Sequence, residues 1–179
     1  MNAQSIDSPD AVGGLATGAW RLDPARSSVE FHVPHFYGLM TVKGRFDSYH
    51  GSLDLSGHPA VEFVIDADSL NTKQKQRDKH LRSRHFFDVA NHPQVSFEAD
   101  TAILDGKTLK ASGRLHAAGK HIPLHVDASI TPLDGEFEIE ATALADQREL
   151  GMTWSPLGIT RAPSKLIVRG RLVRTAEER

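Results

Sequence analysis

Residues 121–143 read HIPLHVDASITPLDGEFEIEATA, and this stretch decides the fold class. From Ile122 to Ile130 every second residue is apolar, whereas those between them are mostly polar. Successive side chains of a β-strand point to opposite faces, so the alternation predicts a strand with one dry face and one wet face. After the turn at Asp134-Gly135, apolar residues alternate with glutamates in the same way. The stretch therefore predicts an antiparallel hairpin.

The same alternation recurs along most of the chain. Val29, Phe31 and Val33, for example, alternate with polar residues. Turn-forming pairs such as Asp105-Gly106 separate neighbouring runs, as in hairpins. About eight or nine strands in a meander are expected. Besides the two in the opening stretch, the predicted strands cover residues 28–33, 42–46, 52–55, 61–66, 95–100, 109–116 and 166–172.

One segment, residues 71–84, interrupts the strands. It reads NTKQKQRDKHLRSR and is rich in good helix formers, with Asn71 or Thr72 available as an N-cap. We expect a short helix here. Its Arg77 and Asp78 are interpreted as forming structural salt bridges that pin the helix to the barrel rim, and the alternative is that the helix covers a ligand.

The composition excludes several classes of function. The chain has 179 residues, which fits one domain. It has no cysteine, so disulfides, zinc-thiolate sites, iron–sulfur clusters and thiol nucleophiles are excluded. A formal net charge of −2 gives no overall field that attracts nucleic acid. No run approaches the roughly 20 apolar residues of a membrane-spanning helix.

The two ends of the chain are expected to differ from its centre. Residues 1–19 are polar, Gly-rich and without a Lys or Arg, which indicates a flexible arm rather than a secretory signal. The folded domain is expected over residues 20–175, followed by a short tail at 176–179. A cytoplasmic location follows from the lack of a signal.

A half-polar meander of this size can cover its apolar face in two ways. It can close into an antiparallel β-barrel or pack as two sheets. A barrel of about eight strands is wide enough either to be filled by side chains or to hold one ligand. The inward positions mix large residues with small ones, namely Gly44, Ala99, Ala111, Gly113, Ala128, Ala141, Ala143 and Gly170. This mixture fits a hollow interior or an interdigitated solid core.

No catalytic or metal-binding motif stands out. The chain has no Gly-x-Ser-x-Gly elbow, no phosphate-binding glycine loop and no His-Glu-x-x-His helix. His121 and His125 share a strand face but lie about 13 Å apart at roughly 3.3 Å per residue, too far for one zinc ion. His32 and His35 fall on opposite faces. No cofactor and no metal are therefore expected.

Two long stretches resemble the YceI-like family of polyisoprenoid-binding proteins. Trp20–Phe46 (WRLDPARSSVEFHVPHFYGLMTVKGRF) is similar to the family's opening strand, His-containing turn and Gly-x-Phe strand. Ser69–Ala99 (SLNTKQKQRDKHLRSRHFFDVANHPQVSFEA) resembles its Ser-Leu-x-Thr, Arg-Asp-x-His-Leu, Phe-Phe-Asp and Pro-x-x-x-Phe elements in order. His116 stands where a Thr is usual, and Glu149–Leu150 replaces the more usual Asp–Phe.

The resemblance implies an all-β, extended lipocalin-like barrel that binds a long isoprenoid lipid, a polyprenyl chain or an isoprenoid quinone, without turnover. Its interior and the helix beside it then supply the candidate ligand contacts, and His35 is included because the family has a corresponding His. The candidates are Phe31, Val33, His35, Phe46, Phe63, Ile65, Leu81, Phe86, Phe87, Phe97, Leu115 and Ile130.

Other functions stay open beside lipid binding. A metal-dependent or His/Glu-dependent barrel enzyme would act on a small apolar substrate. A plain interaction module would have a solid core and hold a partner protein on an outer sheet face. By analogy with the family two chains could also form a homodimer, whereas neither nucleic acid nor stable membrane insertion is expected.

Overall fold

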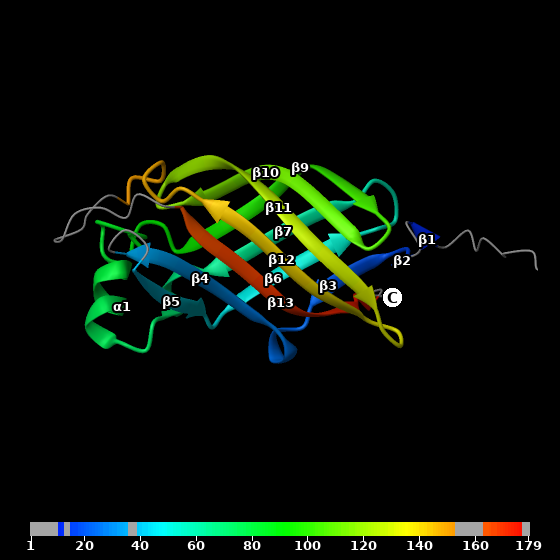
Figure 1. Ribbon diagram of the computed structural model, residues 1–179, viewed down its shortest axis with the longest axis horizontal. Coiled ribbons are helices and arrows are strands. Elements are labelled where there is room, and N and C mark those ends of the chain that lie inside the picture. Colours follow the sequence, from blue (N-terminus) through cyan, green and yellow to red (C-terminus); the bar gives the residue numbers. More distant parts are fainter. Residues whose placement is uncertain (1–10, 13–14, 36–38, 153–162, 177–179) are drawn as a thin grey trace, which may run out of the picture.

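A computed structural model describes residues 11–12, 15–35, 39–152 and 163–176. Strands dominate it, with one α-helix (Figure 1). The elements are β1 (Ala11–Val12), β2 (Leu15–Ala16), β3 (Ala19–Leu22), β4 (Ser28–His35), β5 (Met40–Phe46), β6 (Tyr49–Asp54), β7 (Ala60–Asp66), β8 (Leu70–Asn71), α1 (Lys75–Arg82), β9 (Gln94–Asp105), β10 (Thr108–Ala117), β11 (Lys120–Pro132), β12 (Phe137–Ala145) and β13 (Ser164–Arg174).

The hairpin predicted from residues 121–143 is present as β11 and β12. The two strands pair antiparallel, with Ala128 opposite Ala141 and Ile130 opposite Ile139. Ala128 and Ile130 are buried, whereas Ser129 between them is exposed. The alternation in the sequence therefore marks the two faces of the sheet, as expected.

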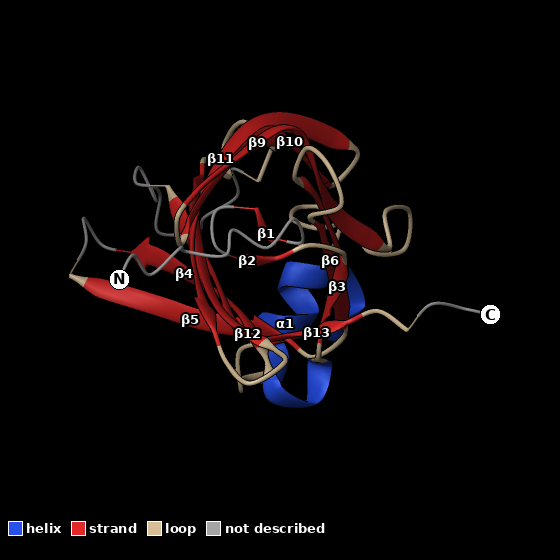
Figure 2. Cartoon of the chain, turned by 90° about the vertical axis from the view of Figure 1, so that its right-hand side faces the viewer, coloured by secondary structure: helices blue, strands red, loops and turns tan. Residues whose placement is uncertain are grey.

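The sheet closes into a barrel. The strands follow the order β12-β11-β10-β9-β7-β6-β3-β13, and β13 pairs back onto β12, which makes eight strands in the ring. Figure 2 views the molecule along the barrel and shows the strands as a ring. Closure removes the free edges that a two-sheet packing would leave. The barrel, one of the two arrangements open to the sequence, is confirmed.

Three members of the ring are bent. β3 and β4 run in the same direction on either side of the 3₁₀ turn Pro24–Arg26, and both pair with β13. β5 and β6 follow one another in the same way and pair with β4 and β3. β7 continues through the 3₁₀ turn Ala67–Ser69 into β8, which pairs with β5. With each pair counted as one bent strand, the barrel is the predicted meander of eight.

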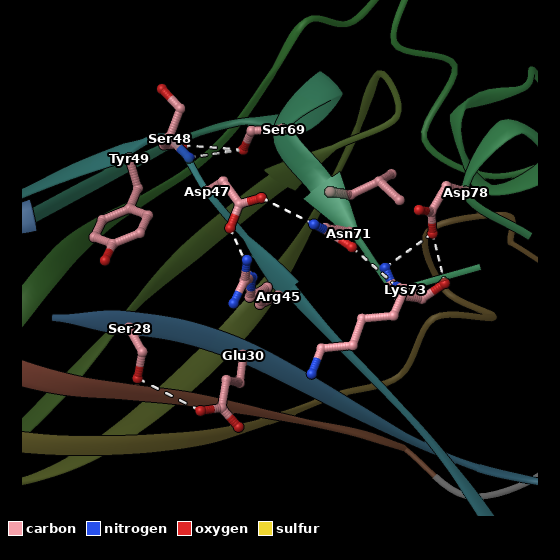
Figure 3. A network of polar contacts seen from close by, with 12 residues as sticks. Ser28, Glu30, Arg45, Asp47, Ser48, Tyr49, Ser69, Asn71, Lys73 and Asp78 are labelled. Carbon is pink, nitrogen blue, oxygen red and sulfur yellow. Dashed lines mark hydrogen bonds and ion pairs between the residues drawn. The ribbon is translucent and has the colours of Figure 1, made fainter. Parts of the chain in front are cut away.

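A polar network holds two of these bends together (Figure 3). The backbone N–H of Ser48 donates to the Ser69 hydroxyl at 3.0 Å. The Asn71 amide donates to Asp47 at 3.2 Å, and Asp47 also pairs with Arg45 at 2.7 Å. The bend between β5 and β6 is thereby fixed to the segment that carries the chain from β7 into α1.

The helix is shorter than expected. The prediction of a helix over residues 71–84 is corrected to Lys75–Arg82, and its N-cap is Gln74, whose side chain makes no cap hydrogen bond. Asn71 instead lies in β8, where its side-chain oxygen accepts from the N–H of Lys73. Thr72 is buried and bonded to Asp78. These competing bonds displace the helix start. None of the described helices is long and apolar enough to span a membrane.

Part of the predicted N-terminal arm packs against the barrel. Leu15 is 1% exposed and belongs to the core, and the carbonyl of Gly18 accepts from the N–H of Leu55 at 2.8 Å. β3 begins at Ala19 and is a strand that the alternation did not predict. Residues 1–10, 13–14 and 177–179 lie outside the described part of the chain.

Candidate functional site

The inner face of the barrel borders a cavity. About 1000 Å³ inside the lining is free of protein atoms, and this figure includes space that opens to solvent. The centre of a water molecule can occupy only about 130 Å³ of that space. The cavity is therefore narrow for its size. Its apolar lining is Leu22, Val29, Phe46, Gly51, Leu53, Val61, Phe63, Ile65, Val95, Phe97, Leu109, Ala111, Leu115, Leu124, Val126, Ala128, Ile139, Ala141, Ala143, Leu166, Ile167, Val168 and Leu172.

The lining offers almost no polar group to a ligand. Its few polar residues, Glu30, Ser52, Glu62, Ser96 and Thr142, alternate along their strands with inward apolar residues. Such positions turn their side chains outward, so these residues border the cavity with backbone atoms. Those backbone groups are bonded within the sheet. The site can hold an apolar guest, and it lacks a charged side chain that would select a polar one.

Four alanines contribute to the hollow interior. Ala111, Ala128, Ala141 and Ala143 lie on the inner face of neighbouring strands and border the cavity. Their short side chains leave space that larger residues would fill. At Gly44, by contrast, a Cβ would lie 2.2 Å from the Phe31 ring, so the aromatic ring occupies that space.

One end of the barrel is closed by large side chains. Trp20 and Phe137 pack with ring centroids 4.2 Å apart and are almost fully buried. Leu15 and Leu55 belong to the same buried cluster, as does Ile130, which is 0% exposed. We call this the Trp20 end. Ile130 lies in the cluster and does not border the cavity.

The opposite end carries α1, the residues 83–93 that follow it, and the β10–β11 turn. We call it the α1 end. Phe87 packs against both core clusters, and its ring lies edge-on to Phe46 with centroids 5.8 Å apart. Phe46 borders the cavity, so Phe87 lies one layer away from it. Leu81 and Phe86 are partly buried beside the same clusters.

A buried threonine organises this end. The Thr72 N–H and hydroxyl both donate to the Asp78 carboxylate, the N–H at 2.9 Å. The Arg77 guanidinium donates to the Thr72 hydroxyl at 2.8 Å and to its carbonyl at 2.9 Å. Arg82 donates to the carbonyls of Asp68 and Leu70. Arg77 and Asp78 thus hold the start of the helix through Thr72, and the predicted salt bridges with the rim are wrong, since neither residue forms an ion pair with a described residue.

His35 lies at the end of β4, within reach of the charge of Arg77. Partial burial lowers the pKa of His35, and the positive Arg77 lowers it further. The imidazole does not border the cavity. A neutral His35 is a polar group at the α1 end, one layer outside the apolar lining.

The structure brings only part of the predicted contact set to the cavity. Phe46, Phe63, Ile65, Phe97 and Leu115 border it. The other seven candidates lie outside the lining: Phe31, Val33, His35, Leu81, Phe86, Phe87 and Ile130. The reasoning from sequence missed lining residues such as Leu124, Val126, Ile139 and Leu166, although all of them occupy inward positions of the alternation. The set of predicted contacts favoured large aromatic residues, whereas the lining also includes aliphatic residues at the inward positions of the strands.

The histidines outside this region show no metal cluster. In the described part of the chain, no group of three or more His, Asp or Glu side chains is placed to hold a metal ion. His125 instead shares a hydrogen bond of 2.8 Å with the hydroxyl of Ser112, the residue opposite it on β10.

The sequence profile of the YceI-like domain matches residues 20–169. The chain belongs to the YceI-like family. A UPF0312 protein of Enterobacter sp. strain 638 is 34% identical over 125 residues, which is 66% of this chain and 65% of that protein. A UPF0312 protein of Pectobacterium carotovorum is 31% identical over 106 residues, or 57% of this chain and 55% of that protein. The chain thus matches about half to two thirds of these relatives' length.

Several solved structures share the fold. BcnA of Burkholderia cenocepacia has a TM-score of 0.72 at 15% identity and is covered over 99% of its length, against 86% of this chain. The Campylobacter jejuni YceI protein gives 0.69 at 19% identity, over 91% of that chain and 80% of this one. A polyisoprenoid binding domain from Saccharophagus degradans gives 0.68 at 15% identity, over 99% of that chain and 89% of this one. At these identities the likeness establishes the barrel.

Proposed function

We propose that this YceI-like protein binds a long apolar isoprenoid chain, polyprenyl or quinone-linked, inside its barrel and carries or sequesters it without chemical change. The observation that supports this most strongly is the narrow, apolar cavity inside the barrel. Small-molecule sites typically carry a few polar groups that orient the ligand. The lack of such side chains in the lining favours a ligand that is apolar along its length. The polyisoprenoid binding domain of the same fold supports the same class of ligand.

Burial alone can supply the affinity. Removing apolar surface from water is favourable by roughly 25 cal/mol per Å². A chain of about 40 heavy atoms at about 0.3 kcal/mol per atom gains on the order of 12 kcal/mol, which corresponds to a nanomolar Kd. A flexible chain fits a narrow space better than a compact ring system does, because its width is that of one or two carbon atoms.

Native mass spectrometry of the purified protein, followed by extraction with organic solvent, tests the proposal. We expect an apolar molecule bound at one per chain. Ala128→Phe should fill the cavity and abolish that occupancy. Ser129→Phe is the matched control, because it adds the same ring at the next, outward-facing position of β11. Equal occupancy in the two variants, or a wild-type protein that neither retains nor takes up a prenyl alcohol, contradicts the proposal.

The same experiment addresses the enzyme alternative. A barrel enzyme would convert a small apolar substrate, and a metal-dependent one would lose that activity on chelation. Recovery of the prenyl alcohol unchanged after long incubation with the protein supports the carrier. Recovery of a converted product supports the enzyme.

A further inference from the structure

The α1 end carries a concentration of positive charge that the net charge conceals. Residues 72–85 contain six Lys or Arg and one acidic residue, Asp78, in a chain whose formal net charge is −2. Asp78 is buried and bonded to Thr72, so it contributes little to the surface. The exposed members are Lys73, Lys75, Lys79 and Arg84.

These four exposed cations make no ion pair with any described residue. Ion pairs up to 4.0 Å do engage most other arginines, among them Arg82 with Asp68 at 2.8 Å. Lys75 and Lys79 are four residues apart and therefore share one face of α1. Asp78, three residues after Lys75, is bonded to Thr72, and Leu81 packs against the core of the barrel. The helix thus presents an outer cationic face that the rest of the described chain leaves unneutralised.

Exposed apolar side chains lie at the same end. Leu39 is 86% exposed and Met40 is 59% exposed, at the start of β5. Met40 pairs with His35, and the charge of Arg77 on α1 contributes to the lowered pKa of His35. Figure 1 shows α1 and the ends of β4 and β5 at the same end of the barrel. Cations beside protruding apolar side chains are the pattern of a surface that lies on a membrane.

We propose that the α1 end docks on an anionic lipid bilayer, with Lys73, Lys75, Lys79 and Arg84 on the headgroups and Leu39 and Met40 inserted between them. The occupant is a membrane surface because the cations and the exposed apolar side chains lie at the same end of the barrel, and a bilayer offers both an anionic layer and an apolar layer beneath it. The proposal rests on the proposed function in one respect: a carrier of an insoluble chain must take it from, or return it to, a membrane. Docking places the helix-covered end of the barrel against that source.

Flotation of the full chain with vesicles tests the docking. The vesicles contain equal parts of phosphatidylglycerol and phosphatidylcholine, or phosphatidylcholine alone. We expect the protein to float with the anionic vesicles at about 50 mM salt, to be released at about 500 mM, and not to float with the neutral ones. A basic side chain near an anionic surface contributes about fivefold in affinity, so Lys75→Gln/Lys79→Gln/Arg84→Gln should weaken binding about 100-fold.

Two matched variants separate this surface from general charge and general hydrophobicity. Arg21→Gln/Lys107→Gln/Lys110→Gln removes the same charge from exposed positions away from α1 and should leave binding unchanged. Leu39→Ser/Met40→Ser should weaken binding to anionic vesicles at least tenfold, whereas Ile103→Ser/Leu133→Ser, which are exposed at the other end, should not. All these positions are exposed, and an unchanged thermal midpoint verifies the fold of each variant.

The outcomes distinguish the docking from the lipid cargo. A chain that retains its apolar molecule in native mass spectra but does not float overturns the docking and leaves the proposed function standing. A chain that floats with the anionic vesicles but never holds a lipid supports the docking and contradicts the proposed function. Equal loss of binding in the α1 variant and its charge control overturns the docking. Retention on heparin without flotation assigns the cationic face to a soluble polyanion, and that result also overturns it.

Discussion

Thr72, the threonine of the Ser-Leu-x-Thr element, shows what a single residue of the family's sequence pattern does in the fold. Its hydroxyl donates to buried Asp78 and accepts from Arg77, so a single oxygen joins the two charges.

Thr72→Val keeps the shape of the side chain and removes both hydrogen bonds of the hydroxyl. We expect the free energy of unfolding to fall by about 1–3 kcal/mol, since a buried carboxylate loses a donor. Thr72→Ser should restore most of it, and Thr108→Val at the exposed first residue of β10 should cost less than about 0.5 kcal/mol. Urea denaturation measures all three, and equal losses at 72 and 108 would contradict the role.

His35 gives the protein a dependence on pH with a definite sign. Burial, and then the charge of Arg77, lower the pKa of His35 below its ordinary value of 6.5. The unfolded chain therefore binds a proton at a higher pH than the folded chain does. The contribution of the neutral His35 to the stability of the fold is complete above pH 6.5, the ordinary pKa of histidine, and is lost as the pH falls through the pKa of His35 in the folded chain.

The matching prediction concerns His35→Gln. Between about pH 7 and about pH 5 the free energy of unfolding of the wild type should fall more steeply than that of the variant, because glutamine does not titrate. Denaturant titrations at several pH values measure the two slopes. Parallel profiles for the two proteins would show that the imidazole titrates alike in both states.

At the scale of elements, β9 and β10 are joined with one irregularity. Their register shifts between Ser112 and Gly113, so Asp100 is left without a partner residue on β10. A Cβ on Gly113 would lie 2.0 Å from the backbone oxygen of Glu98. Gly113→Ala should therefore lower the free energy of unfolding by about 1–3 kcal/mol or more. Gly57→Ala, which meets nothing within 4 Å, is the control. Thermal unfolding with equal midpoints for the two variants would contradict this account of the bulge.

The elements differ in how far the sequence predicts them. β11 and β12 follow from alternation alone, since each has five or more alternating positions. β3 has only four residues and pairs through contacts that are distant in sequence, with β13 and β6. Its alternation is too short to detect. The start of α1 was misplaced because Asn71 and Thr72 make side-chain bonds other than the helix caps that their residue types suggest.

At the scale of the whole molecule, the sequence predicts which residues face inward but not which of them leave space. Phe31 is a large inward residue, yet its ring fills the position above Gly44. Ile130 faces inward too, but is fully buried among other core side chains. Ala128, two residues before it on β11, borders the cavity. Position along the barrel axis decides between these outcomes, and that position depends on strand tilt and register that alternation does not encode.

A ligand enclosed along its length stabilises the whole fold in proportion to that length. Each buried CH₂ contributes about 0.8 kcal/mol to binding, so prenyl alcohols of increasing length should bind with increasing affinity until the cavity is full. At a concentration of about 100 times Kd, binding adds about 2.7 kcal/mol, which raises the thermal midpoint by about 5–10 °C. A thermal-shift series from farnesol to geranylgeraniol and longer alcohols, all at one fixed concentration, measures the rise in affinity with length. A shift that is the same for every length would indicate binding at the surface.

The most direct measurement is a crystal structure of the protein grown with geranylgeraniol. The account predicts one continuous chain of density along the barrel axis, in contact with Phe63, Phe97 and Leu166 and ending toward the α1 end. An interior in which the protein's own side chains meet across the axis, with the alcohol absent or bound outside the strands, would contradict it.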